Sequence, residues 1–91
     1  MRNKWLRDTL YTEKLVLESL LEGKKRLEEI ERYVKQNFDF ENYTPTFPEG
    51  SLQDEIKRYE SLGIVEKMEN GYSLTQLGKK LLQYFKIKRE Y

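Results

Sequence analysis

The chain has 91 residues, a net charge of +1, 36% charged side chains, and neither cysteine nor histidine. A chain of this length forms one domain with a small core and leaves little room for an enclosed catalytic cavity. The composition excludes disulfides, thiol nucleophiles, most zinc sites and the usual general base near neutral pH. No pair of carboxylates, lysines or hydroxyls has recognisable catalytic spacing, so we expect neither an enzyme nor a bound cofactor or metal.

The sequence also predicts where the protein resides. No apolar run approaches the roughly 18 residues of a membrane span, and residues 1–11 lack the continuous apolar region of a signal peptide. We therefore expect a cytoplasmic protein that does not enter a membrane. Abundant lysine and glutamate, together with the absence of alanine, are compatible with a thermophile-like or archaeal composition.

Apolar residues that recur every three or four positions predict four helices. The first extends from Thr12, as N-cap, to Glu22, and the second covers residues 25–37. The third begins at Ser51, where Ser-Leu-Gln-Asp approximates a capping box, and the fourth begins at Thr75. The inward-facing positions expected on the last two helices are Leu52, Ile56, Tyr59, Leu62, Leu77, Leu81, Leu82 and Phe85. Each helix is half apolar, so the helices must pack on one another.

A β-hairpin is predicted between the third and fourth helices. Gly63 ends the third helix, because glycine tolerates the left-handed conformation that is common after a helix C-terminus. Asn70 and Gly71 can both adopt positive φ, as the two central positions of a type I′ turn require. We therefore expect residues 64–68 to pair with residues 72–74 across an Asn70-Gly71 turn.

This order of helix, glycine, short hairpin and capped helix resembles the segment from recognition helix to wing in winged helix-turn-helix domains. The residues that carry the resemblance are Leu62 to Lys67, Tyr72 to Thr75 and Gly78, with Leu20 to Gly23 and Leu27 to Ile30 upstream. The resemblance implies a mainly α fold with a small β-hairpin: a three-helix core, a two-stranded wing and a C-terminal helix. The chain would then be a single domain with a core at residues 12–85, an N-terminal extension at 1–11 and a C-terminal tail at 86–91.

The connection between the second and third helices is longer than the three or four residues that are common in a helix-turn-helix. Residues 38–50 contain both prolines and four aromatic side chains, Phe38, Phe40, Tyr43 and Phe47. These aromatics can stack on exposed bases, dock a protein partner, or fold back as a lid over the small core. The sequence leaves these roles open.

Charge is distributed unevenly along the chain. Residues 38–63, which contain the third helix, carry −4, whereas residues 1–11 carry +2 and residues 64–91 carry +3. The resemblance implies that the third helix enters the DNA major groove, yet Asp54 and Glu55 in its first turn would repel phosphates. Acidic residues at this position also have a structural role, because they interact favourably with the helix dipole.

The resemblance further implies a DNA-binding surface on the third helix, the start of the second helix and the wing. Gln53, Lys57 and Arg58 are expected to reach base edges or phosphates. The cluster Lys24 to Arg26 lies where the family's second helix approaches the DNA backbone. The alternative is that these residues only begin the second helix and face solvent. The complete candidate DNA-binding set is Lys24, Lys25, Arg26, Gln53, Lys57, Arg58, Ser61, Lys67 and Asn70.

Both ends of the chain carry apolar residues that the helical core does not require. They are Trp5, Leu6, Leu10, Tyr84, Ile87 and Tyr91. In one arrangement the two ends pack on each other within a single chain. In the other they join two chains as a homodimer, which would present two third helices to successive DNA half-sites.

Two functions are compatible with these patterns. The first is a dimeric transcriptional regulator that binds double-stranded DNA without a cofactor and places residues 51–62 in the major groove. The second is a winged-helix module for protein-protein interaction within a larger assembly, with the aromatic segment 38–47 or the acidic third helix as its contact surface. The near-neutral charge favours the second function, and the small chain with apolar ends favours the first.

Overall fold

The computed structural model of the chain describes residues 3–89, with side chains described up to residue 85. Over this range the protein is mainly helical, with α1 (Lys4–Glu18), α2 (Leu27–Asn37), α3 (Leu52–Ser61) and α4 (Gln76–Arg89). Strands β1 (Val65–Met68) and β2 (Gly71–Leu74) form an antiparallel hairpin. The predicted fold class, mainly α with one small hairpin, is confirmed. None of the described helices is both long and apolar enough to cross a bilayer.

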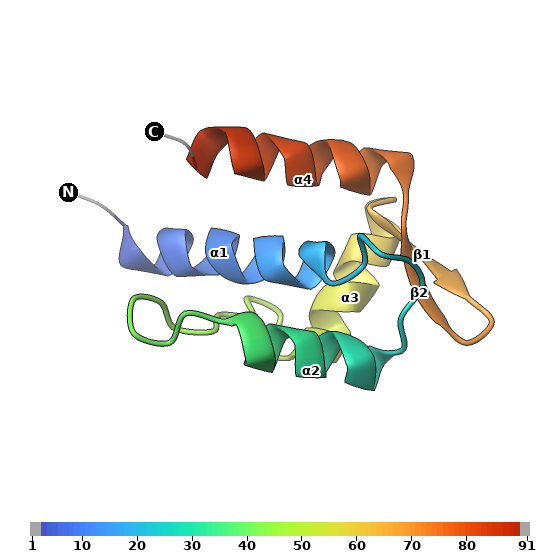
Figure 1. The fold of residues 1–91 in the computed structure, drawn as a ribbon, viewed down its shortest axis with the longest axis horizontal. Helices are drawn as coiled ribbons and strands as arrows, with labels where there is room; N and C mark the ends of the chain where they lie inside the picture. Colours follow the sequence, from blue (N-terminus) through green and yellow to red (C-terminus); the bar gives the residue numbers. More distant parts are fainter. Residues whose placement is uncertain (1–2, 90–91) are drawn as a thin grey trace.

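Helix α1 is the centre of the fold. Figure 1 shows it between α4 and α2, and both of these helices contact it. The start of α1 and the end of α4 lie at one end of the molecule, and the hairpin lies at the other. Helix α3 packs against β1, and α4 packs against β2. The most deeply buried apolar side chains come from every element except β2: Val16, Leu17, Ile30, Ile56, Val65 and Leu82.

Helix α1 begins at Lys4 and includes residues 4–11, so the expectation that Thr12 caps the first helix is wrong. Asn3 caps the helix, because its side-chain oxygen accepts a hydrogen bond from the Leu6 N–H at 3.1 Å. Thr12 lies inside the helix, where its hydroxyl donates to the Asp8 carbonyl at 2.7 Å. A threonine in a helix interior can bond back to the preceding turn in this way, so residue type alone does not identify a cap.

The other helices start close to their predicted positions, but two of their apolar residues point outward. Ser51 caps α3 as expected, accepting a hydrogen bond from the Asp54 N–H at 3.1 Å. Leu62 and Leu77 were expected to be buried, and both are exposed. Each lies at the end of its helix, Leu62 as the C-cap of α3 and Leu77 in the first turn of α4. The apolar stripe of a helix is covered only as far as the neighbouring element extends.

The long connection between α2 and α3 folds back on the first half of α1. The Tyr43 ring stacks on the Tyr11 ring, with centroids 3.8 Å apart, and the Tyr11 ring also meets Phe38 edge to face. The Thr46 N–H donates to the Thr12 hydroxyl at 3.0 Å. Of the three roles that the sequence left open, folding back over the core therefore applies to Phe38 and Tyr43, whereas Phe40 remains exposed.

The hairpin turn is displaced by one residue from the predicted position. Met68 pairs with Gly71, so the two loop residues are Glu69 and Asn70. Neither has positive φ, and the expected type I′ turn at Asn70-Gly71 is therefore wrong. Gly71 itself has the expected positive φ, 156°, and a Cβ atom at this position would also lie 2.5 Å from the carbonyl oxygen of Lys25. Gly71 thus allows the start of α2 to approach the hairpin closely.

Candidate nucleic-acid interface

The basic residues before α2 join the edge of the hairpin. The Lys25 N–H donates to the Tyr72 carbonyl at 3.0 Å, and the Tyr72 N–H donates to the Lys25 carbonyl at 2.8 Å. This antiparallel bridge adds one residue of a third strand next to β2. On the other side of β2, Tyr72 is paired in register with Lys67 of β1. Two basic segments that are far apart in the sequence therefore become neighbours.

The three side chains of this row, Lys25, Tyr72 and Lys67, lie on one face of the sheet. Residues directly opposite each other in antiparallel strands share a face, with Cβ atoms about 4.5–5.5 Å apart. Because Tyr72 uses both backbone groups with Lys25, its pair with Lys67 is the closer, non-hydrogen-bonded type. Lys67 is exposed, and Lys25 and Tyr72 are partly exposed. We call these three residues the cationic row.

The flanking residues Lys24 and Arg26 differ in how far a neighbouring acidic group balances their positive charge. Lys24 is exposed. The Arg26 guanidinium lies 3.6 Å from the Glu29 carboxylate, which also accepts the Arg26 backbone N–H at 2.8 Å. This backbone hydrogen bond, helped by the nearby positive charges, lowers the pKa of Glu29. The charge of Arg26 is therefore partly balanced, and the cluster contributes less than three full positive charges.

The exposed face of α3 has mixed charge. Gln53, Lys57 and Ser61 are exposed as expected, and Asn70 is exposed at the hairpin tip. The Ser61 hydroxyl donates to the Arg58 carbonyl at 2.8 Å, so its proton is already engaged. Lys57 is flanked one turn away by two exposed acidic residues, Asp54 and Glu60. This face alone does not attract phosphate.

Arg58 and Glu55 point toward α1 rather than away from the protein. The Arg58 guanidinium forms ion pairs with Glu13 of α1 at 2.7 Å and with Glu55 at 3.0 Å. The expectation that Glu55 approaches and repels phosphates is wrong, because its side chain is only 1% exposed. Its second oxygen accepts the Glu49 N–H at 3.0 Å. Arg58 is committed to this cluster and is not positioned to read base edges.

Burial changes the acidity of groups beside this cluster. Desolvation raises the pKa of Glu13, and the Arg58 charge offsets only part of this effect. Desolvation also raises the pKa of Tyr59, with the Glu13 and Glu55 carboxylates acting in the same direction. These groups lie inside the fold and connect α3 to α1, so their role is structural.

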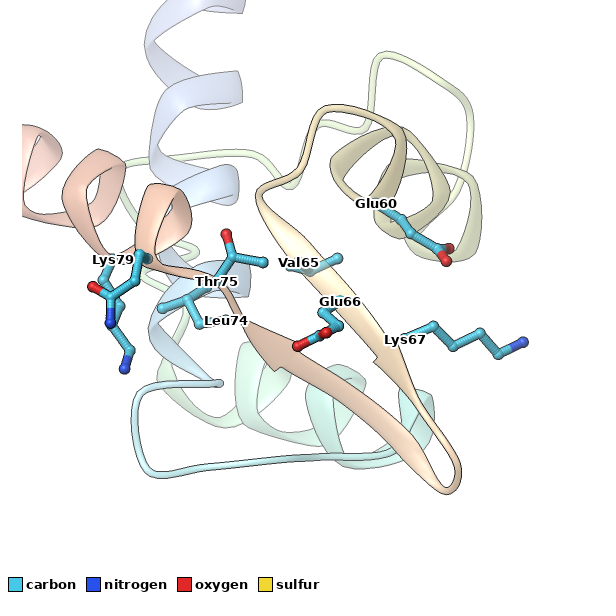
Figure 2. Close-up of a pocket in the computed structure, with 8 residues that line it drawn as sticks. Glu60, Val65, Glu66, Lys67, Leu74, Thr75 and Lys79 are labelled. Carbon is cyan, nitrogen blue, oxygen red and sulfur yellow. The ribbon is translucent and has the colours of Figure 1, made fainter.

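A shallow depression of about 620 Å³ lies between α3, the hairpin and the start of α4. Figure 2 shows the residues around it, including the acidic Glu60 and Glu66 and the basic Lys67 and Lys79. The Lys67 side chain extends away from the depression. The mixed charge of this depression makes it a weaker candidate for phosphate contact than the cationic row.

The chain matches no protein-family model, no curated protein and no solved structure. The proposed function therefore depends on the geometry of this chain alone.

The structure brings together some of the candidate site residues and separates others. Lys25 and Lys67 are united in the cationic row, with Lys24 and Arg26 adjacent in the chain, whereas Arg58 is withdrawn toward α1. Tyr72 is not among the site residues predicted from the sequence. The signal that could have found it is its position next to Gly71, since a glycine in a strand marks the close approach of another backbone.

Four of the apolar residues proposed for dimerisation have described side chains, and they lie on the first half of α1 and the second half of α4. Trp5, Leu6, Leu10 and Tyr84 are between 42% and 56% exposed. Ile87 belongs to the backbone of α4, but its side chain is not described, and Tyr91 lies outside the described residues. The first half of α1 and the second half of α4 thus present apolar side chains to solvent.

Proposed function

We propose that this chain is a winged helix-turn-helix protein that binds double-stranded DNA and acts as a dimeric transcriptional regulator. The order α1, bridge residue Lys25, α2, α3, β1, β2 and α4 supports the winged-helix assignment. The observation that carries the DNA-binding proposal is the cationic row, which places two lysines on one face of the sheet, on either side of the partly exposed Tyr72 ring. Lysine side chains contact phosphates, and such contacts hold a protein on the duplex without reading its sequence.

In this proposal the hairpin edge and the start of α2 provide affinity, and α3 provides sequence preference. Gln53 is suited to adenine, because its amide can form two hydrogen bonds to that base in the major groove. Lys57 is the remaining basic residue on the exposed side of α3. Arg58 is removed from the contact set that the sequence suggested, because Glu13 and Glu55 occupy it.

Removing the cationic row should flatten the salt dependence of DNA binding. Each neutralised phosphate contributes about −0.9 to the slope of log affinity against log salt, so Lys25→Ala with Lys67→Ala should reduce the slope by about 1.8. The measurement is fluorescence anisotropy with random duplex DNA at several salt concentrations. A control with the same change in charge is Arg32→Ala with Lys80→Ala, at exposed positions on α2 and α4.

The control pair should keep the slope of the unmodified protein. Asp54→Asn should tighten binding to all duplexes, since it removes an exposed negative charge from the first turn of α3. Equal slopes for the row variant and the control variant, or a protein that does not bind duplex DNA at low salt, would contradict the proposal.

The dimer is proposed to form through the exposed apolar ends of α1 and α4. Trp5→Ser with Leu10→Ser changes side chains that are 56% and 42% exposed and lie outside the buried core, so the fold should persist and the mass should shift toward monomer. Light scattering over a range of protein concentrations measures this shift. Leu62→Ser, at an exposed position elsewhere, should leave the mass unchanged. If the unmodified protein is a monomer at high concentration, the dimer proposal is wrong.

A further inference from the structure

An apolar groove lies between α2 and the segment that leads into α3, outside the cationic row. It consists of two depressions, of about 280 and 310 Å³, which share Glu31, Ser51 and Leu52 among their lining residues. The first depression is lined mainly by apolar side chains, among them Val34, Phe40 and Phe47. Part of the apolar surface formed by α2 and the connection therefore faces this depression and is not buried in the core.

Phe40 makes this groove unusual for the surface of a small protein. Its side chain is 59% exposed, although its ring lies 4.9 Å from the buried Phe38 ring. The neighbouring Tyr43 ring stacks on Tyr11, and Phe38 is part of the core. Both of these rings are therefore packed against other side chains of the same chain. Large exposed apolar side chains beside a groove are typical of sites where another molecule docks.

The edge of the groove is acidic. Glu28 and Glu31 lie on α2 along the groove, both are exposed, and neither forms an ion pair with a described residue. Lys35 is the basic residue among the side chains that line the two depressions, so two acidic residues and one basic residue give the lining a net charge of −1. This negative charge repels phosphates, so the exposed Phe40 ring is poorly suited to stacking on a nucleic-acid base.

We propose that the groove docks a short segment of a partner protein that presents bulky apolar side chains flanked by lysine or arginine. The apolar side chains would enter beside Phe40 and Phe47, and the basic side chains would pair with Glu28 and Glu31. From Leu27 to Val34, α2 advances about 10 Å, which matches about two turns of a bound helix. This interaction goes beyond DNA binding, because it gives the chain a protein partner on a groove outside the cationic row, although Gln53 lines the edge of that groove.

The test uses a short fluorescein-labelled peptide with a leucine and a phenylalanine one helical turn apart, between pairs of lysines. Two matched peptides replace either the lysines with glutamates or the apolar pair with serines. Fluorescence anisotropy should show saturable binding of the first peptide, with affinity that falls as salt rises, and at least tenfold weaker binding of the other two. Protein variants then locate the site.

Phe40→Ser and the pair Glu28→Lys with Glu31→Lys should each weaken binding of the first peptide about tenfold or more. All three positions are exposed, so the variants should fold, and a thermal melt followed by circular dichroism checks this. Glu22→Lys with Glu69→Lys makes the same change in net charge at exposed positions outside the groove lining. This control pair should retain affinity within about twofold, since charges beyond a Debye length are largely screened.

Three results would overturn the proposal. In the first, the glutamate peptide binds as well as the lysine peptide. In the second, Phe40→Ser weakens the binding of labelled single-stranded DNA and leaves the binding of the peptide unchanged, which would make the groove a nucleic-acid site. In the third, Phe40→Ser lowers the mass of the unbound protein in light scattering, which would identify the occupant as a second copy of this chain. None of these outcomes depends on whether the cationic row binds duplex DNA.

Discussion

Replacing Arg58 with alanine should lower the free energy of unfolding by about 2–3 kcal/mol. The change leaves Glu55, which is almost fully buried, and the partly buried Glu13 without their positive partner, and breaking a buried ion pair costs about 3–5 kcal/mol. The expected loss of stability is below this range because the Arg58 side chain is 33% exposed, so water can partly replace its charge. Urea denaturation followed by circular dichroism measures the loss.

The matched control is Arg32→Ala, at an exposed position on α2, where we expect a change within about 0.5 kcal/mol. Glu55→Gln should also destabilise the protein, and the double variant with Arg58→Ala should lose less than the sum of the two single changes. That deficit is expected because both changes disrupt the same ion pair. If Arg58→Ala proves as mild as Arg32→Ala, the Glu13–Arg58–Glu55 cluster does not hold α3 against α1.

Replacing Gly78 with alanine should destabilise the protein by about 1–3 kcal/mol, the opposite of the usual effect within a helix. Alanine normally gains about 1 kcal/mol over glycine in a helix interior. At this position a Cβ atom would overlap the carbonyl oxygen of Ile64 and lie 3.0 Å from Leu74 Cδ1. Inserting atoms into a well-packed contact costs about 1–3 kcal/mol, since the neighbours must move.

The neighbours of Gly78 have little freedom to move. The Thr75 hydroxyl accepts the Gly78 N–H at 3.0 Å, and the Thr75 N–H donates to the Ile64 carbonyl at 3.1 Å. Moving α4 outward would break the contacts that fix its start. The control compares Gln83→Ala with Gln83→Gly at an exposed position on α4, where alanine should be the more stable by about 1 kcal/mol. Thermal and urea denaturation report both comparisons. A Gly78→Ala variant that is more stable than the unmodified protein would show that α4 does not press on Ile64.

The sequence by itself determined the local elements of this protein. Helical periodicity placed α2 and α3 within two residues of their observed starts, and the capping role of Ser51 is confirmed. Gly63 has a φ of 78°, as expected of a glycine after a helix C-terminus. These features depend on residues close together in the chain, so short-range patterns were sufficient to predict them.

Other features required the tertiary structure because two plausible local patterns competed. Thr12 has the residue type of an N-cap, but the capping role belongs to Asn3, and packing under the connection makes Thr12 an interior position. Asn70-Gly71 has the composition of a type I′ turn, yet Gly71 is needed for the approach of Lys25. In the first case one local cap competed with another, and in the second a long-range contact overrode the local preference.

The candidate site depends most strongly on tertiary structure. Sequence patterning indicated Lys24 to Arg26 and Lys67 as separate basic positions, and only the bridge through Tyr72 joins them in the cationic row. Likewise, Glu55 and Arg58 have the residue types of an exposed helix face, but the proximity of Glu13 draws them inward. A charged side chain is placed by the partners that can satisfy it, and partners distant in the sequence become neighbours only when the chain folds.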